Sequence, residues 1–483
     1  MYIGLDLGSS GLRALLIDEN QQVRGAAEAH YEMLRPHPGW SEQVPADWIE
    51  ATHACFAQLR TDFPDDMAAL RGIGISGQMH GATVLDRARQ VLRPCILWND
   101  TRSAVEAAEL DADPRFRELT GNIVFPGFTA PKLAWMRNHE PDLFAQVDLV
   151  LLPKDYLRLW LTGEEVSDFS DAAGTSWLDG GTRQWSAELL DQTGLGPEHM
   201  PALVNGSDAS GIVRAEVADA LGLPAGVVVA GGGADNAVAA CGIGAVRGGQ
   251  GFVSLGTSGV LLAAIDQWAT SPGQAVHAFC HAVPDAWYQM GVTLSATDSA
   301  NWLATVTGQT VPAMAQAVGD QISGPSPVTF LPYLSGERTP HNDAGMRGAF
   351  VGLEHQSSPA QLMQAVMEGV AFSMADCQVA LQSSGTAINS LFAIGGGSQS
   401  RRWVETLATV LGQPVGLLAG GENGAAMGAA RLAIMAATGA SAASVMLAPQ
   451  PAETIDPRTE FSAAYEDALN RYRRLYPALK SAL

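Results

Sequence analysis

A short stretch rich in glycine and hydroxyl side chains occurs twice in this chain. Residues 6–13 read DLGSSGLR, and residues 254–260 read SLGTSGV. Each copy follows a short apolar run and leads into another, which predicts a strand, a tight turn and a returning strand. Small residues in such a turn let its amides and hydroxyls surround an anion. One copy alone would indicate only a hairpin, but two copies predict two similar halves that face one polyphosphate.

The two copies differ at a position that matters for charge. The first begins with Asp6 and the second with Ser254. A carboxylate beside a phosphate-binding turn is useful when a divalent cation lies between them, because Mg²⁺ prefers oxygen ligands. Asp6 is therefore the candidate metal ligand of this pattern.

The length of 483 residues is too great for one core, since domains usually hold about 100–200 residues. The repeat favours two large domains, which we expect at 1–244 and 245–483. The net charge is −22, and no run of Lys or Arg offers the basic patch that nucleic-acid binding needs.

Five cysteines are widely scattered, which is typical of reduced thiols in a cytoplasmic protein. His277, Cys280 and His281 form one metal-like group, but no fourth zinc ligand is near in sequence. We find neither a signal peptide nor an apolar run of about 18 residues. We therefore expect a soluble protein of the cytoplasm with no membrane contact.

Two stretches combine a strand with polar groups at its end. Residues 73–81 read IGISGQMHG, and residues 96–102 read ILWNDTR. An indole face together with hydrogen-bonding side chains favours a pocket for a sugar or polyol. Taken singly, Trp98 is more typical of a core residue than of a ligand platform, and His80 is more typical of a satisfied polar residue. The candidate contacts are Met79, His80, Trp98, Asn99 and Asp100.

Residues 227–236 read VVVAGGGADN, which predicts a buried strand, a glycine turn and an Ala-rich helix from Asp235 to Gly242. An Asp at a helix start is often only a cap. Here it lies near the join between the halves, where it could orient and deprotonate a hydroxyl. A carboxylate with an ordinary pKa of about 4 would suffice for this role.

Two further regions are interpreted from local pattern. Residues 391–400 predict a strand, a glycine turn and a helix, which either turns a corner or packs a flat heterocycle against bare backbone. Residues 163–182 are rich in loop-forming residues. Asp168 and Asp171 lack the spacing of a metal motif, so we expect them on the surface.

Longer patterns carry a family resemblance. Residues 127–139 (GFTAPKLAWMRNH), and residues 348–353 (GAFVGL) continuing to 361–362 (QL) and 365–368 (AVME), resemble the two signatures of the FGGY carbohydrate kinases. The resemblance covers nearly the whole chain. It implies an α/β protein with the two-domain actin/hexokinase/Hsp70-like ATPase fold, built from duplicated ribonuclease H-like domains around an interdomain cleft.

Within that family, residues 77–81 and 96–100 are similar to bacterial members that phosphorylate D-xylulose. The resemblance implies transfer from MgATP to O5 of that sugar in pentose (xylose) catabolism. Asp235 would be the base and would contact the sugar with Met79 and His80, and Asp6 would hold Mg²⁺. The residues implied for the phosphates are Gly8, Ser9, Ser10, Arg13, Gly256, Thr257 and Ser258. Those implied for adenosine are Gly396, Gly397, Ser400 and Arg401.

Two rivals remain at this point. One is an FGGY kinase for another ketose or polyol, such as ribulose, L-xylulose or glycerol. The other is a non-enzymatic ATP switch of the actin or Hsp70 type, which would not need the sugar pocket. The expected partners are a small sugar and ATP, without nucleic acid, and the family suggests a homodimer.

Overall fold

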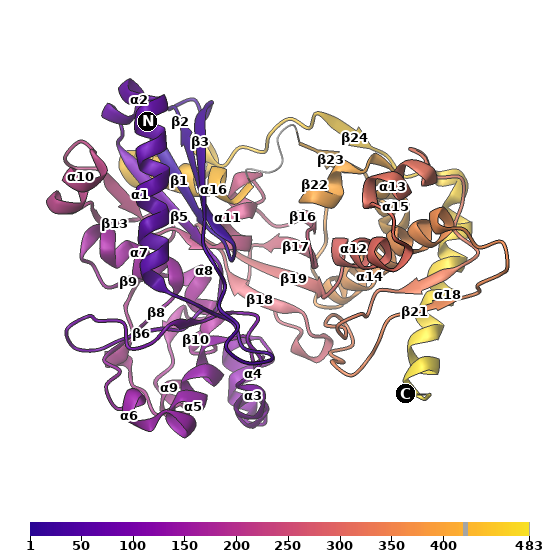
Figure 1. Cartoon of the computed structure of the whole chain (residues 1–483), viewed down its shortest axis with the longest axis horizontal. Coiled ribbons are helices and arrows are strands. Elements are labelled where there is room, and N and C mark those ends of the chain that lie inside the picture. Colours follow the sequence, from indigo (N-terminus) through magenta and orange to yellow (C-terminus); the bar gives the residue numbers. More distant parts are fainter. Residues whose placement is uncertain (419–423, 483) are drawn as a thin grey trace.

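The computed structural model describes residues 1–418 and 424–482, which form two lobes (Figure 1). The first lobe is built on a mixed sheet of order β13-β14-β5-β1-β2-β3, and β15 pairs with β5 beside β14. The strands are β1 Tyr2–Leu7, β2 Gly11–Ile17, β3 Val23–His30, β5 Gly72–Gly77, β13 Ala209–Ile212, β14 Val228–Ala230 and β15 Gly233–Ala234.

The second lobe is built on a sheet of order β18-β19-β17-β16-β22-β23-β24. Its strands are β16 Gln250–Leu255, β17 Gly259–Ile265, β18 His277–Cys280, β19 Trp287–Thr293, β22 Ser390–Ile394, β23 Val415–Leu417 and β24 Glu453–Ile455.

The two sheets repeat one topology. In the first, β1, β2 and β3 are antiparallel neighbours, and β5 and β14 continue the sheet in parallel. In the second, β16, β17 and β19 correspond to the antiparallel set, and β22 and β23 to the parallel strands. The predicted hairpins are confirmed, with turns at residues 8–10 and 256–258. The duplicated two-domain fold expected from the repeat is therefore present.

Helices cover both faces of the first sheet. On the outer face, α1 (Pro45–Asp62), α7 (Pro153–Thr162) and α10 (Ala215–Leu221) share a hydrophobic core with its strands. On the other face, α11 (Asp235–Gly242) and α16 (Gly424–Thr438) lie between the two sheets in one continuous core.

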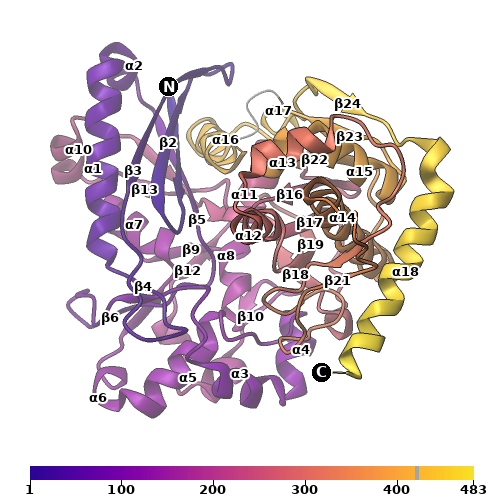
Figure 2. The ribbon, with the colours of Figure 1, turned by 45° about the vertical axis from the view of Figure 1, so that its right-hand side comes forward.

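Helix α16 comes from the C-terminal half but packs against β1 and β5 of the first lobe (Figure 2). The approach is so close that only glycine fits on the strands. A Cβ atom on Gly4 would lie 1.8 Å from the carbonyl oxygen of Ala426, and one on Gly74 would lie 1.9 Å from that of Ala429. The helix from one half and the strands of the other therefore pack with their backbones in direct contact.

The second sheet carries a separate helical layer. The long helix α14 (Pro359–Ser383) begins at a capping box, in which Ser358 and Gln361 each bond the other's backbone amide. Four further helices lie in this lobe, namely α12 Thr297–Thr307, α13 Val311–Val318, α15 Arg401–Leu411 and α18 Ser462–Lys480. The small elements are β20 Thr329–Leu331, β21 Ala349–Val351 and α17 Ala442–Val445.

An insertion between β5 and β13 forms the lower part of the first lobe in Figure 1. It holds short paired strands, namely β6 Thr83–Leu85, β7 Cys95–Ile96, β8 Leu149–Leu151, β9 Val166–Asp168, β10 Leu178–Asp179, β11 Gln184–Trp185 and β12 Ala202–Val204. Strand β4 (Glu42–Gln43), which precedes the insertion, pairs with β7.

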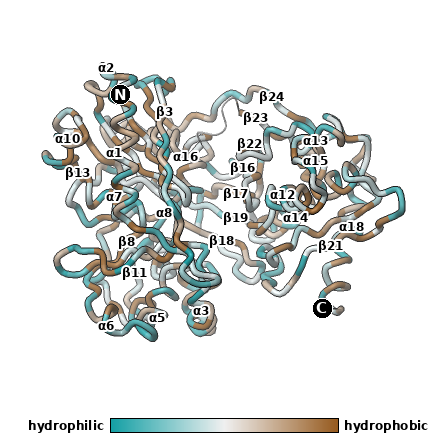
Figure 3. Tube along the Cα trace, viewed as in Figure 1, coloured by the Kyte–Doolittle hydropathy of each residue, from teal (hydrophilic) through white to brown (hydrophobic). Residues whose placement is uncertain are grey.

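The insertion's helices are α3 Ala104–Asp111, α4 Pro114–Thr120, α5 Thr129–His139, α6 Pro141–Phe144, α8 Phe169–Ala172 and α9 Ala187–Gln192, and α2 (Pro64–Ala68) follows α1. Hydrophilic segments gather on the outer helices and loops, for example around α3 and α6 (Figure 3). In the described parts of the chain, we find no helix with the length and apolar character to cross a membrane.

The expectation that Asp168 and Asp171 lie on the surface is wrong. Both side chains are fully buried. They face Lys154 at the start of α7, with 2.9 Å from its Nζ to Asp168 Oδ1 and 3.4 Å to Asp171 Oδ2. The sequence spacing of Asp168 and Asp171 did not predict this cluster, because the cation that the two carboxylates surround is a lysine side chain and not a metal ion.

Candidate active site

A cleft of about 230 Å³ lies between the two halves, and each half contributes to its walls. The first half supplies Asp6, Gly8, Ser9, Gln78, Asp235, Asn236 and Ala239. The second half supplies Phe252, Ser254, Ile394 and Ala425. The structure therefore brings together the first hairpin, the candidate base and the strand that leads into the second hairpin.

The first turn is fixed by side chains around it. Ser9 Oγ donates to Gln78 Oε1 at 3.0 Å and accepts from Trp98 Nε1 at 2.9 Å. Tyr31 donates to the carbonyl oxygen of Gly8 at 2.6 Å, and Gln43 donates to that of Ser9 at 2.6 Å. The amide of Gly8 donates to the carbonyl oxygen of Gly11 at 3.0 Å, which closes the turn. The bonds from the surrounding side chains use carbonyls and a hydroxyl, so they leave the amides of Ser9 and Ser10 to an anion.

Asp6 and Arg13 lie opposite each other across this hairpin. Burial raises the pKa of Asp6, whose carboxylate lines the cleft. Arg13 forms an ion pair with Glu28 at 3.0 Å and is not part of the cleft lining. Ser10, another predicted phosphate contact, is exposed beside the cleft.

The second turn is held by the start of α12. The carbonyl oxygen of Gly256 accepts from the amide of Thr297 at 2.9 Å and from its hydroxyl at 2.8 Å. The carbonyl oxygen of Thr257 accepts from the amide of Ala296 at 2.8 Å. Gly256, Thr257 and Ser258 continue from the cleft-lining Ser254 but do not themselves line the cleft in this structure.

Asp235 is the first residue of α11 and opens into the cleft. Its Oδ1 accepts from the amide of Asn236 at 2.7 Å and from Asn236 Nδ2 at 2.9 Å. Within the described residues, Oδ2 has no hydrogen-bond donor, so it remains available to a substrate hydroxyl.

The pKa of Asp235 is not at the ordinary value that would suffice for a base. Burial, with a further contribution from the charge of Asp6, raises its pKa to about 7 despite the hydrogen bonds from Asn236. Both causes come from residues and packing that are distant in sequence, so the local pattern could not reveal them.

His80 lies at the end of β5 with its ring stacked on Phe128 at 4.3 Å between centroids. Its Nδ1 is 2.6 Å from the carbonyl oxygen of Gly174. Burial lowers the pKa of His80 to about 3, so the ring is neutral at pH 7. A carbonyl can only accept, so Nδ1 carries the proton and Nε2 is left as an acceptor.

The other candidate sugar contacts differ in exposure. Met79 is buried, with Tyr288 Oη 4.0 Å from its sulfur. Trp98 is 46% exposed, and its indole nitrogen is tied to Ser9. Asn99 Oδ1 is buried without a partner among the described residues. None of these candidate contacts is among the residues that line the cleft, although Trp98 bonds the cleft-lining Ser9.

Asp100 is not brought into the cleft. Its side chain is fully buried and pairs with Arg102, from Oδ2 to Nη2 at 2.7 Å. It also accepts from the amides of Ser41 at 2.6 Å and Arg102 at 2.9 Å. Because both oxygens are already bonded, Asp100 supports the loop after β7 and is not placed to contact a sugar.

The candidate adenosine turn follows β22, which is the parallel neighbour of β16. Gly396 is exposed, and a Cβ atom there would meet no atom within 4 Å, which leaves room for a flat ring. Ser400 caps α15 by accepting from the amide of Trp403 at 3.4 Å. Arg401 pairs with Glu453 at 2.9 Å. Gly396, Gly397, Ser400 and Arg401 lie beyond the cleft-lining residue Ile394.

Sequence reasoning did not assign roles to Gln78, Asn236 or Arg338. The guanidinium of Arg338, on a loop of the second half, lies 3.6 Å from the ring centroid of Phe125 in the first half. Burial lowers the pKa of Arg338 to about 10 and raises that of Glu337 to about 8. For Arg338, the signal in the sequence was the high density of polar residues at 335–341.

Among the described residues, no three His, Cys, Asp or Glu side chains are grouped to hold a metal ion. His277 instead stacks on Phe279 at 5.6 Å, and Cys280 and His281 are buried. Magnesium is compatible with this finding, because it is commonly held by one or two carboxylates together with phosphates and water.

The two-domain α/β architecture is of the actin/hexokinase-like ATPase type that sugar kinases have. The chain matches the FGGY family of carbohydrate kinases, its N-terminal domain over residues 1–242 and its C-terminal domain over residues 251–437. The chain therefore belongs to the FGGY family of carbohydrate kinases. The proposed boundary after residue 244 falls between the two matched spans and stays a prediction.

Individual proteins of known name match the chain over nearly its full length. The chain is 46% identical to the xylulose kinase of Escherichia coli (strain K12) over 482 residues, covering 99% of each chain. It is 57% identical to a xyloylose kinase from Brucella ovis of known crystal structure, with a TM-score of 0.98 and complete coverage of both chains. The xylulose kinase from Rhodospirillum rubrum is 30% identical, with a TM-score of 0.92 and 99% coverage of both.

Proposed function

We propose that this chain transfers the γ-phosphoryl group of ATP to O5 of D-xylulose, giving D-xylulose 5-phosphate and ADP. The observation that carries the proposal is the free Oδ2 of Asp235 in the cleft that also contains the first phosphate hairpin. The relatives named xylulose kinase, which match the chain over nearly its full length, support the choice of sugar.

The protein's part in such a transfer is mostly positioning. Phosphoryl transfer passes through a loose transition state, so alignment and neutralisation of charge supply most of the rate. As O5 bonds to phosphorus, its proton passes to Asp235 Oδ2, and the bond from phosphorus to the β,γ-bridging oxygen breaks with ADP as the leaving group. The amides of Ser9 and Ser10 and those of residues 256–258 would hold the phosphates on either side.

Asp6 fits a Mg²⁺ ion carried by the nucleotide. Its carboxylate lines the cleft beside the phosphate turn and forms no ion pair within the described residues. Bound Mg²⁺ would offset the negative charge of the β- and γ-phosphates. It would also relieve the cost of keeping two carboxylates, Asp6 and Asp235, in one cleft.

The sugar would bind on the first half. His80 offers a neutral acceptor at Nε2, Asn99 offers a buried amide oxygen without a partner, and Trp98 offers a half-exposed aromatic face. Hydroxyl donors and one apolar face are what a small ketose presents.

The test is a coupled assay of ADP release with D-xylulose, D-ribulose, L-xylulose and glycerol. We expect the largest kcat/KM for D-xylulose. A larger value for another acceptor would reassign the substrate, and ADP release that is independent of any sugar would favour an ATP switch.

Three further features belong to this proposal. The lobes should close around sugar and nucleotide to exclude water, which small-angle scattering would detect as compaction.

All five cysteines are buried free thiols, which suits a cytoplasmic enzyme. A homodimer, suggested by the family, would be tested by light scattering.

A further inference from the structure

A buried charge cluster lies directly behind the base, and the proposed chemistry does not use it. It consists of Lys154 and Arg158 on α7, Asp155 beside them, and Asp168 and Asp171 at α8, and every one of these side chains is fully buried. Burial alone would lower the pKa of Lys154, but the three aspartates outweigh it and raise that pKa to about 12.

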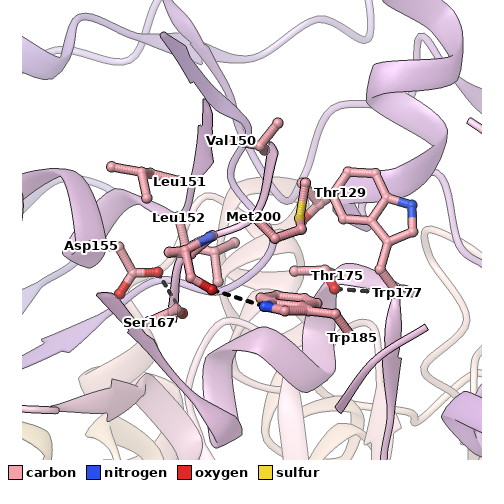
Figure 4. Close-up of a pocket in the computed structure, with 11 residues that line it drawn as sticks. Thr129, Val150, Leu151, Leu152, Asp155, Ser167, Thr175, Trp177, Trp185 and Met200 are labelled. Atoms are coloured by element: carbon pink, nitrogen blue, oxygen red, sulfur yellow. Dashed lines mark hydrogen bonds between the residues drawn. The ribbon is translucent and has the colours of Figure 1, made fainter. Parts of the chain in front are cut away.

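The cluster is not a ligand site. Figure 4 shows Asp155 bonded to Ser167 at the edge of a neighbouring hollow, at 2.7 Å. That hollow measures about 10 Å³, which is room for about one water molecule. The role of the cluster therefore lies in its contacts with other parts of the protein, not with a ligand.

Arg158 of this cluster, and Ser170, which is bonded to Asp168 of the cluster, hold the segment that carries the base. An Arg158 Nη2 proton is donated to the carbonyl oxygen of Gly231, at the start of the glycine turn. Ser170 Oγ accepts from the amide of Ala234 at 3.1 Å, one residue before Asp235. The same hydroxyl donates its only proton to Asp168 Oδ2, and Asp168 Oδ1 lies 2.9 Å from Lys154 Nζ.

We propose that Asp168 and Ser170 are positioning residues for phosphoryl transfer, holding Asp235 in the geometry that accepts the substrate proton. The inference rests on the proposed role of Asp235 as the base. Neither residue touches the substrate, and both act through the backbone amide of Ala234.

The direction of these hydrogen bonds is what makes the arrangement specific. A serine hydroxyl has one proton, so once it donates to Asp168 it can only accept from Ala234. The charge of Lys154 fixes the Asp168 carboxylate that receives this proton, and a carboxylate acceptor makes the bond stronger than a neutral one. The position of the Ala234 backbone, and with it the start of α11, is thereby fixed by residues outside the helix.

The local sequence explains why outside support is needed. The N-cap residue of α11 is Ala234, whose methyl group cannot cap the helix. The three glycines before it make the backbone intrinsically free. At Gly233 a Cβ atom would lie 2.8 Å from Ser170 Oγ, so the hydroxyl is pressed against this turn. The pairing of β15 with β5 holds one side of this backbone, and the contact with Ser170 fixes the Ala234 amide on the other.

Steady-state kinetics of Ser170→Ala test the proposal, with D-xylulose and ATP each varied. The expected result is a fall in kcat on the order of 10- to 10²-fold, the size of effect that a displacement of about 1 Å produces. The KM values for both substrates should stay within about twofold, because the base acts mainly in the transition state. The kcat of Ser170→Cys, whose thiol is slightly larger than the hydroxyl and bonds more weakly, should fall between those of the wild type and Ser170→Ala.

Ser373→Ala is the matched control, since it removes another buried serine hydroxyl, 2.8 Å from Tyr472 Oη in the second lobe. Its thermal midpoint should match that of Ser170→Ala, while its kcat should stay near that of the wild type. Equal kcat values for the two variants would overturn the inference.

A double variant separates the inference from the proposed function. If Ser170 acts through Asp235, then Ser170→Ala adds no further loss of kcat in an Asp235→Asn background. Losses that multiply in the double variant would overturn the inference and leave Asp235 as the base. Normal turnover of Asp235→Asn itself would overturn both.

Discussion

Asp6 and Asp235 line one cleft from different elements, and the charge of Asp6 adds to burial in raising the pKa of Asp235 to about 7. Two carboxylates in one cleft repel each other, so the site suits a substrate that brings a cation with it. A nucleotide with bound Mg²⁺ is such a substrate.

Replacing Asp235 by alanine should lower kcat by roughly 10²–10⁴-fold, the usual contribution of a general base. Nucleotide binding should persist, since the phosphate turns are untouched. Turnover by coupled assay and ADP affinity by calorimetry would check both halves of this expectation. Near-normal turnover would remove Asp235 from the role of base.

The rate should depend on pH through Asp235. Below pH 7 the carboxyl group is increasingly protonated and cannot accept a proton, so kcat/KM should rise with pH and level off above about 8. A profile of kcat/KM for the sugar between pH 5 and 9 measures this midpoint. A flat profile down to pH 5 would contradict the raised pKa in the free enzyme.

Asp6→Asn should change two quantities. Removing the neighbouring charge should shift the midpoint of that pH profile downward, because Asp6 raises the pKa of Asp235. Replacing a charged oxygen ligand by a neutral one should raise the Mg²⁺ concentration for half-maximal rate on the order of tenfold. An unchanged Mg²⁺ requirement would exclude Asp6 as a ligand.

Gly74→Ala should destabilise the junction between the halves. The added Cβ would lie 1.9 Å from the carbonyl oxygen of Ala429, a backbone atom that cannot move aside cheaply. Overpacking of this kind costs about 1–3 kcal/mol, visible as a lower midpoint in urea unfolding. Gly273→Ala is the control, since its Cβ would meet no atom within 4 Å.

Lys154→Met should be among the most damaging single changes. Removing one member of a buried ion-paired cluster leaves Asp168 without its cation and Asp155 with Arg158 alone, which costs about 3–5 kcal/mol. Lys480→Met, which breaks an exposed pair with Asp343, should leave the unfolding midpoint nearly unchanged. Equal midpoints for the two variants would show that the buried cluster adds no stability.

The sequence alone was enough to predict the elements that depend on neighbouring residues. The two hairpins follow from apolar runs on either side of glycine and hydroxyl turns, and the start of α11 at Asp235 follows from a buried strand and three glycines. Repetition of the hairpin predicted the two similar halves. The signatures at 127–139 and 348–368 predicted the family, which the match to both FGGY domains confirms.

Tertiary structure decided whatever depends on groups far apart in the chain. Asp168 and Asp171 are buried because Lys154 lies between them. Asp100 does not reach the cleft because Arg102 and the amide of Ser41 bond its carboxylate. The pKa of Asp235 depends in part on the charge of Asp6. Solvation and electrostatic energies are set by distances through space, which residue order along a strand or turn does not contain. Local pattern therefore identified the residues near the cleft, and folding decided which of them stay charged, exposed and free to react.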